Sequence, residues 1–183
     1  MDQNSEFGQM MQQAAAIKSE QVKQDRRKFE KAPQFIQHTL FHCAKPEIVK
    51  VRENPDVEER LEVAQGFRAE GNEFFKNKQY LDANNSYEYA LGCFWYIKTT
   101  EPNFKEKGIK DEYLSFHDDF DDNEEVIAFK AACIGNIAAC QLSMEMWDLC
   151  IFACNVTLEL DPRNVKALYR RCQARTLPFS CGT

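Results

Sequence analysis

Five polar side chains occur at helical spacing in three separate stretches of the chain, and together they could bind an anion. Arg68 and Asn72 are four residues apart, as are Lys166 and Arg170, so each pair shares one face of a helix. Asn136 lies in the small, apolar run IGNIAAC. Arg, Lys and Asn side chains offer mostly hydrogen-bond donors. A groove that presents all five would therefore suit two carboxylates at the end of an extended peptide.

The helices that must position these side chains are clearest in residues 134–171, IGNIAACQLSMEMWDLCIFACNVTLELDPRNVKALYRR. This stretch predicts a helix, a turn, a second helix, a turn and a third helix. Asp161-Pro162 marks the end of the second helix, since Pro cannot continue it but suits the first turn of the next. The small or apolar positions that face the core are Ala138, Leu142, Cys150, Cys154 and Thr157.

A similar helical hairpin is predicted upstream, over residues 56–79 and 80–98. Asn54 is the expected N-cap, with Pro55 at the first helical position. Small residues at the contact would let the two helices approach closely. The apolar or small positions of this upstream hairpin are Leu61, Ala64, Phe67, Gly71, Phe74 and Phe75 on the first helix, then Ala83, Tyr87, Ala90, Leu91 and Phe94 on the second.

The two hairpins align at a constant offset in the residue numbering. Hairpin repeats of this kind have a period of about 34 residues, and the offset is close to twice that period. It therefore indicates one repeat plus an insertion at about 99–125, where we expect a longer second helix, a loop and a third helix that starts near Asp122. The aligned pairs are Gly71 with Ala138, Phe74 with Gln141, Ala83 with Cys150, Tyr87 with Cys154, and Ala90 with Thr157.

These patterns divide the chain into three parts. Residues 1–54 are expected to form an N-terminal accessory segment that is partly helical or disordered, with an extended stretch at 47–51. Residues 55–175 form the helical-repeat domain. Pro178 and Gly182 predict an irregular tail over 176–183, so the third repeat is expected to be truncated after its first helix.

Composition narrows the functional classes. The chain has 183 residues, of which 44% are hydrophobic and 28% charged, as in globular proteins. Its net charge of -6 argues against a nucleic-acid partner. No apolar run approaches the roughly 20 residues that span a bilayer, and no signal peptide is evident, so we expect no membrane partner. Eight cysteines without a CxxC motif favour a reducing compartment, namely the cytoplasm with the nucleus as an alternative.

Two pairs of residues have a spacing that zinc sites use. Cys150 and Cys154 are four apart on one helix face, and His38 and His42 have the same spacing. Small core-facing residues explain the cysteines better, because free Cys is among the most buried residue types. An ordinary surface pair explains the histidines better, since no carboxylate accompanies them.

Asp119, Asp121 and Asn123 have the spacing of a calcium-binding loop. That loop requires Gly at its sixth position and Glu at its twelfth. Here these positions hold Glu124 and Lys130, so a solvated acidic turn is favoured. We therefore expect no cofactor and no metal.

The motifs FRAEGNEFF, IGNIAAC and VKALYRR resemble the dicarboxylate-clamp tetratricopeptide (TPR) domains of heat-shock co-chaperones. The resemblance covers about Glu58 to Arg175, and the insertion is similar to that of immunophilin-like and aryl-hydrocarbon-receptor-interacting members. It implies an all-α fold of TPR hairpins wound into a right-handed superhelix. It also implies that a clamp binds the C-terminal Glu-Glu-Val-Asp tail of heat-shock protein 90 or heat-shock protein 70. Its residues would be Arg68, Asn72, Asn136, Lys166 and Arg170, although the family more often has Lys in place of Arg68.

The sequence thus predicts a protein-interaction module that acts as a co-chaperone or adaptor and is not an enzyme. One alternative is a repeat scaffold for an unrelated partner, such as a client protein. Another is the TPR fragment of a peptidyl-prolyl isomerase-type immunophilin. Residues 1–60 are too short and too helical for the mostly β catalytic domain of such an enzyme, and no nucleophile–base pair or phosphate loop is visible.

Overall fold

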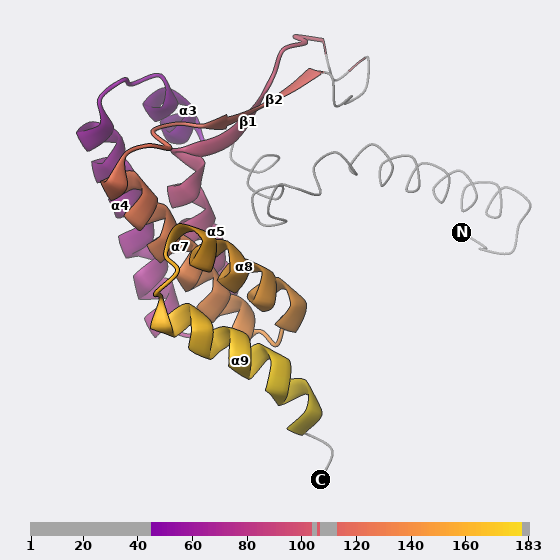
Figure 1. Cartoon of the computed structure of the whole chain (residues 1–183). Coiled ribbons are helices and arrows are strands. Elements are labelled where there is room, and N and C mark those ends of the chain that lie inside the picture. Colours follow the sequence, from indigo (N-terminus) through magenta and orange to yellow (C-terminus); the bar gives the residue numbers. More distant parts are fainter. Residues whose placement is uncertain (1–44, 104–105, 107–112, 181–183) are drawn as a thin grey trace, which may run out of the picture. The chain divides into compact units, whose positions relative to one another are not determined.

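The computed structural model describes residues 45–103, 106 and 113–180, so the expectations for 1–44, including His38 and His42, lie outside the described residues. The predicted all-α helical-repeat fold is confirmed, with one small pair of strands between the two hairpins (Figure 1). The elements in chain order are α3 Pro46–Arg52, α4 Val57–Lys76, α5 Tyr80–Gly92, β1 Trp95–Thr99, β2 Leu114–Asp118, α7 Glu124–Ser143, α8 Trp147–Leu160 and α9 Val165–Ser180.

The first helices of the two hairpins, α4 and α7, begin with the same cap. The side chain of Asp56 accepts hydrogen bonds from the backbone N–H groups two and three residues on, at 2.8 and 3.4 Å. Asn123, the aligned residue of the second hairpin, does the same at 3.0 and 3.1 Å. Both caps satisfy donors that no helical carbonyl reaches. The predicted cap at Asn54 is therefore wrong by two residues; Asn54 instead accepts a hydrogen bond from the backbone of Asp56.

The turns of the two hairpins also match at the same offset. Lys78 and Glu145 both have φ of 60°, in the left-handed region. In each turn, the N–H group of the next residue bonds the carbonyl five residues before it, at 2.9 Å in the first hairpin and 2.8 Å in the second. This C-terminal geometry satisfies carbonyl groups at the end of the helix. The repeat predicted from side-chain pattern is thus present in the backbone as well.

The core lies between helices that pack in chain order. α4 packs on α5, α5 on α7, α7 on α8 and α8 on α9, while α7 also contacts both α4 and α9. Of the ten positions aligned between the two hairpins, all but Phe74 are buried, and Phe74 packs against the core. These positions include Gly71, Ala83 and Ala138, whose small size permits close helix packing.

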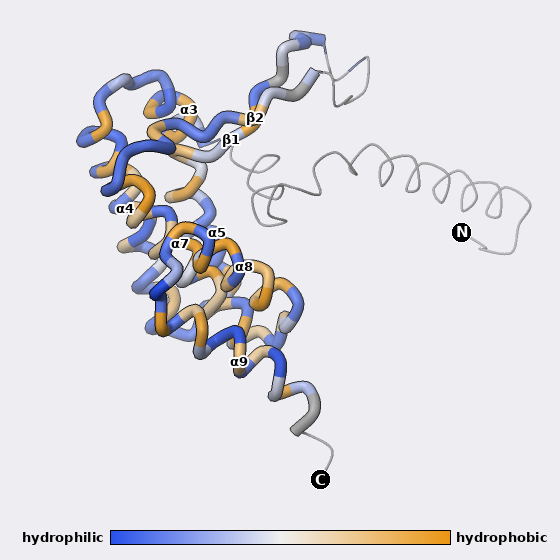
Figure 2. The backbone as a smooth tube through the Cα atoms, viewed as in Figure 1, coloured by the Kyte–Doolittle hydropathy of each residue, from blue (hydrophilic) through white to orange (hydrophobic). Residues whose placement is uncertain are grey.

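α7 is the most internal helix of the repeats. Its 20 residues are long and apolar enough to cross a membrane by length and composition, but 61% of its apolar window is buried inside the protein. Helices α5, α8 and α9 pack on it, which accounts for its composition. Figure 2 shows this apolar character along α7 and α8, whereas α4 alternates between polar and apolar residues.

The insertion between the hairpins differs from the prediction of a longer second helix. α5 ends at Gly92, and the aromatic run that follows enters β1 instead. Phe94, Trp95 and Tyr96 are all buried, and aromatic residues favour strands over helix when a partner strand is present. β2 is that partner, since the N–H group of Asp119 bonds the carbonyl of Phe94 at 3.0 Å. Within residues 99–115, which belong to a separate unit, the N–H group of Thr100 bonds the carbonyl of Tyr113 at 2.7 Å.

Buried ion pairs fix residues 118 and 119 to the helices. Arg60 of α4 is only 4% exposed and bonds the Asp119 carboxylate at 2.6 Å, and Tyr96 donates to the same oxygen at 2.7 Å. Lys130 of α7, 1% exposed, pairs with Asp118. Charges this deeply buried are stable only when paired. Asp118, at the end of β2, and Asp119, directly after it, therefore have structural partners. Asp121 and Asp122 are exposed in the turn that follows, which agrees with the predicted solvated acidic turn.

Two further expectations at the ends of the described chain are corrected. Residues 47–51 are helical, not extended, because Ile48 and Val51, three residues apart, both point into the core from α3. The tail predicted to be irregular from residue 176 is helical to Ser180. Pro178 lies within α9, two residues before the helix ends. A proline removes one backbone N–H donor, and here this does not end the helix.

Candidate functional site

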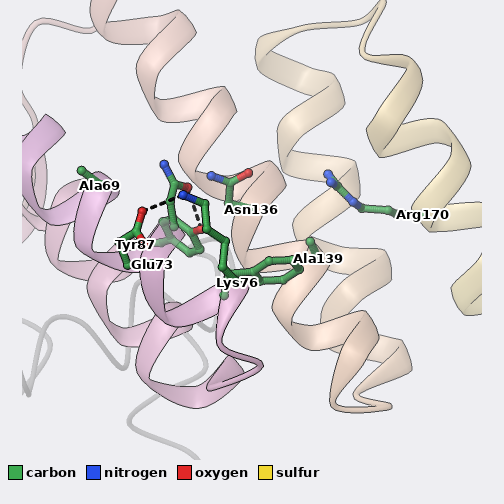
Figure 3. Close-up of a pocket in the computed structure, with 9 residues that line it drawn as sticks. Ala69, Glu73, Lys76, Tyr87, Asn136, Ala139 and Arg170 are labelled. Carbon is green, nitrogen blue, oxygen red and sulfur yellow. Dashed lines mark hydrogen bonds and ion pairs between the residues drawn. The ribbon is translucent and has the colours of Figure 1, made fainter.

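A cleft of about 340 Å³ lies between α4, α5, α7 and α9, and it brings together three of the five predicted residues (Figure 3). Asn72 comes from α4, Asn136 from α7 and Arg170 from α9, so each repeat contributes one side chain. The remaining lining residues are Ala69, Glu73, Phe75, Lys76, Tyr87 and Ala139. The lining of the cleft thus combines polar and charged side chains with small and aromatic ones.

Arg170 is held at the cleft by a backbone group of the neighbouring repeat. Its Nη1 donates a hydrogen bond of 3.0 Å to the carbonyl of Gly135, the residue before Asn136. A guanidinium has five N–H donors, and this contact uses one of them. The separation of Asn136 and Arg170 in sequence equals one repeat length of this fold. Figure 3 shows the two side chains on neighbouring helices, both at the cleft.

Asn72 is held by Tyr87 of α5. The phenolic hydroxyl of Tyr87 donates a hydrogen bond of 2.9 Å to Oδ1 of Asn72. Tyr87 is only 2% exposed, and this burial, with smaller contributions from nearby thiols, raises the pKa of Tyr87 to about 12 although Arg68 and Arg170 act in the opposite direction. The phenol therefore keeps its proton at neutral pH and remains a donor.

The other two predicted residues do not line this cleft. Arg68 is half-buried with its guanidinium carbon 5.9 Å from the ring centroid of Phe129, and its buried Nε has no hydrogen-bond partner within the described part of the chain. Lys166 is exposed on α9, one turn before Arg170. The structure thus separates the predicted five into three cleft residues, one half-buried arginine and one exposed lysine.

Comparison with known proteins adds independent information. No protein-family model matches the sequence. The chain is 29% identical over 127 residues to peptidyl-prolyl cis-trans isomerase FKBP42 of Arabidopsis thaliana, covering 69% of this chain and 30% of that protein. It is 30% identical over 113 residues to the Hsp70/Hsp90 co-chaperone CNS1 of Saccharomyces cerevisiae, covering 62% and 22%. It is also 30% identical over 117 residues to peptidyl-prolyl cis-trans isomerase FKBP4 of Bos taurus, covering 64% and 22%.

Its homologues are co-chaperones and immunophilins. The chain spans between about a fifth and a third of the length of these relatives. The aligned regions are long enough to include most of the helical repeats, so the likeness to co-chaperones and FKBP immunophilins concerns the part of the chain that holds the cleft.

Sequence reasoning missed Lys76 and Tyr87 as cleft residues. Lys76 is four residues after Asn72 on the same face of α4, and this spacing was a usable signal. Its ammonium pairs with Glu73 at 2.7 Å, but both side chains are 68% exposed, so the pair contributes little. Tyr87 was assigned to the core. The hydroxyl of Tyr87 could have indicated its place beside a polar residue, because a buried Tyr usually finds a hydrogen-bond partner.

The chemistry available in the cleft is recognition by hydrogen bonds and charge. Arg170 and Lys76 are cationic, Asn72 and Asn136 carry amide donors, and Glu73 is the acidic member of the lining. Across the described residues, no group of three or more His, Cys, Asp or Glu side chains could hold a metal ion. The prediction that Cys150 and Cys154 are core residues is confirmed, since both are completely buried.

Proposed function

We propose that this chain is a protein-interaction module that binds the C-terminal Glu-Glu-Val-Asp tail of heat-shock protein 90 or heat-shock protein 70 and acts as a co-chaperone or adaptor. The observation that carries the proposal is that Asn72, Asn136 and Arg170, from three successive repeats, line one donor-rich cleft. The relationship to the Hsp70/Hsp90 co-chaperones named CNS1 in two yeasts supports the same class of partner.

In this proposal the cleft binds the carboxylate end of the tail. Arg170 can hold a carboxylate with two parallel hydrogen bonds, and the amide groups of Asn72 and Asn136 donate to a second carboxylate or to the peptide backbone. Lys166, exposed on the same helix as Arg170, adds a point charge that reaches the ligand from outside the cleft. Arg68 adds positive charge from the side of Tyr87.

The expected affinity follows from these contacts. Each charge-assisted hydrogen bond contributes about 1.5–3 kcal/mol. After the cost of ordering the peptide is subtracted, three to five such contacts correspond to a Kd on the order of micromolar. Because Lys166 and Lys76 are exposed, the affinity should fall as salt concentration rises.

Calorimetric titration tests the proposal. A peptide that ends in Glu-Glu-Val-Asp is compared with the same peptide carrying an amidated C-terminus. The expected result is binding of the free-acid peptide and a loss of at least tenfold on amidation, since the amide removes the terminal negative charge. Equal binding of the two peptides would contradict the carboxylate-binding mechanism.

Prolyl isomerase activity is the second candidate, because FKBP42 and FKBP4 are isomerases by name. We expect that this chain lacks that activity. The shared region is only a minor part of those proteins and corresponds to the helical repeats. An isomerisation assay on a proline-containing peptide checks this, with no acceleration expected. A rate increase that scales with protein concentration would overturn it.

The proposed partners also imply a location in the cytoplasm, with the nucleus as the alternative, and they leave room for a client protein bound elsewhere on the chain. Affinity purification of the chain and of its Arg170→Ala variant separates these interactions. Chaperones should be lost from the variant, whereas a client bound elsewhere should remain. Unchanged chaperone recovery would argue for a scaffold that does not use the cleft.

A further inference from the structure

The contact between Tyr87 and Asn72 connects the core of the first repeat to its cleft. Tyr87 lies on α5 and Asn72 on α4, 15 residues apart in sequence, and the phenolic hydroxyl donates to Oδ1 at 2.9 Å. Both residues line the cleft, but Tyr87 is 2% exposed whereas Asn72 is half-buried. Asn72 is therefore the member of the pair that a ligand can reach.

The ring of Tyr87 is held in place by the residue next to Asn72. A Cβ atom added at Gly71 would lie 2.7 Å from Cε1 and 2.8 Å from Cδ1 of Tyr87. These distances show that the ring lies directly against the backbone of Gly71, where only glycine leaves enough room. Gly71 thus brings the phenol close to α4, and the next residue on that helix receives its hydrogen bond.

The direction of this hydrogen bond determines what the carboxamide can present to a ligand. A carboxamide has an acceptor oxygen on one side and two N–H donors on the other. A buried phenol that keeps its proton offers a donor, so the oxygen of Asn72 turns toward it and the NH₂ group is left to donate into the cleft. If the carboxamide were reversed, its oxygen would face an incoming carboxylate and repel it.

We infer that Tyr87 is a positioning residue that orients the carboxamide of Asn72 so that its NH₂ group faces an anionic ligand in the cleft. The inference rests on the proposed function, because it assigns Tyr87 a part in the binding of the same peptide tail. The hydrogen bond from Tyr87 gives the cleft a selectivity for anions that an Asn72 side chain free to rotate would not have.

A double-mutant cycle tests the inference. The Kd of the free-acid Glu-Glu-Val-Asp peptide is measured for the parent chain, Tyr87→Phe, Asn72→Ala and the double variant. Tyr87→Phe should weaken binding about threefold to tenfold, and it should have no further effect in the Asn72→Ala background. Unchanged affinity of Tyr87→Phe would overturn the inference. An equal loss in both backgrounds would also overturn it, since the effect would then not pass through Asn72.

A control and a second measurement guard against a purely structural effect. Tyr80→Phe removes a hydroxyl from the same helix but outside the cleft lining, and its affinity should equal that of the parent. The side-chain NH₂ resonances of Asn72, observed by NMR without peptide, should shift in Tyr87→Phe if the hydrogen bond orients the amide. Unshifted resonances would contradict the inference even if the variant had lost stability.

The outcomes also separate the inference from the proposed function. If the parent chain does not bind the free-acid peptide, the proposed function and the inference are both wrong. If the parent binds and Asn72→Ala weakens binding while Tyr87→Phe does not, the proposed function stands and only the positioning role of Tyr87 is overturned.

Discussion

Arg170 of α9 donates a hydrogen bond of 3.0 Å to the backbone carbonyl of Gly135 in α7. The bond places a guanidinium from the third repeat beside Asn136 of the second repeat. A second arginine, Arg171, attaches α9 to α8 through a hydrogen bond of 2.9 Å to Asn155. The position of Arg170 in the cleft is therefore set by the packing of α9 against α7 and α8, not by local sequence alone.

Replacement of Arg170 by alanine should weaken binding of the free-acid Glu-Glu-Val-Asp peptide at least tenfold, which is about 1.4 kcal/mol. The reason is the loss of a bidentate partner for a carboxylate, and calorimetric titration measures it. Arg175→Ala is the matched control, since Arg175 lies on the same helix but lines a separate cleft of about 610 Å³. Equal losses for the two variants would indicate a nonspecific effect of charge.

Lys166→Ala should also weaken binding, by tenfold or more at low salt. Because Lys166 is exposed, its contribution is a screened charge interaction and should shrink as salt is added. Titrations at about 0.05 M and 0.5 M salt measure this, with Lys50→Ala on α3 as an exposed control outside the cleft. A loss that does not change with salt would show that Lys166 acts in another way.

Much of the fold follows from sequence because its determinants are local. The caps, the hairpin turns and the aligned core positions depend on residues within one helix or turn, so the constant offset between the hairpins could be found by inspection. Asn136 was predicted because it is a polar residue in a small, apolar run, and Arg170 because it shares a helix face with Lys166, four residues before it. Residue type and helical spacing thus identified Asn72, Asn136 and Arg170, which the structure brings together in the cleft.

The rest depends on contacts between residues far apart in the chain. β1 was predicted as helix because nothing local shows that Arg60 meets Asp119, 59 residues away. α3 was predicted as extended because a helix of seven residues carries too few positions to show a period. Arg68 was placed with the cleft residues by spacing, but in the structure it turns toward Phe129.

Two glycines on α4 should respond oppositely to alanine. At Gly71 a Cβ atom would overlap the ring of Tyr87, so Gly71→Ala should destabilise the fold by about 1–3 kcal/mol. At Gly66 a Cβ atom would meet nothing within 4 Å, so Gly66→Ala should stabilise the helix by about 0.5–1 kcal/mol. Urea unfolding followed by circular dichroism measures both values. Similar effects of the two changes would contradict the close contact at Gly71.

Asp119→Ala should destabilise the fold by about 2–4 kcal/mol at pH 7, because Arg60 would be left buried without its carboxylate partner. Urea unfolding measures this, and Asp122→Ala, which changes an exposed acid nearby, is the control with little expected effect. A loss no larger than that of the control would show that Arg60 does not depend on Asp119.

The same carboxylate makes stability depend on pH. Burial acts to raise the pKa of Asp119, but the hydrogen bonds from Arg60 and Tyr96 outweigh it and hold the pKa below its ordinary value. The Asp119 carboxylate therefore binds a proton more tightly in the unfolded chain than in the folded one. Its contribution to the free energy of unfolding is complete above about pH 4 and is lost as the pH falls below that value. Unfolding free energies at pH 7 and pH 3 should show a larger difference for the parent than for Asp119→Ala. Equal differences would contradict this assignment.

The central claim is that the cleft formed by Asn72, Asn136 and Arg170 receives the chaperone tail. NMR of the isotope-labelled chain during titration with the free-acid Glu-Glu-Val-Asp peptide tests it most directly. We predict that the side-chain NH₂ resonances of Asn72 and Asn136 shift in a saturable way, while the indole N–H of Trp147, which marks the separate second cleft, stays unchanged. Saturable shifts at Trp147 with unmoved Asn72 and Asn136 resonances would contradict the claim.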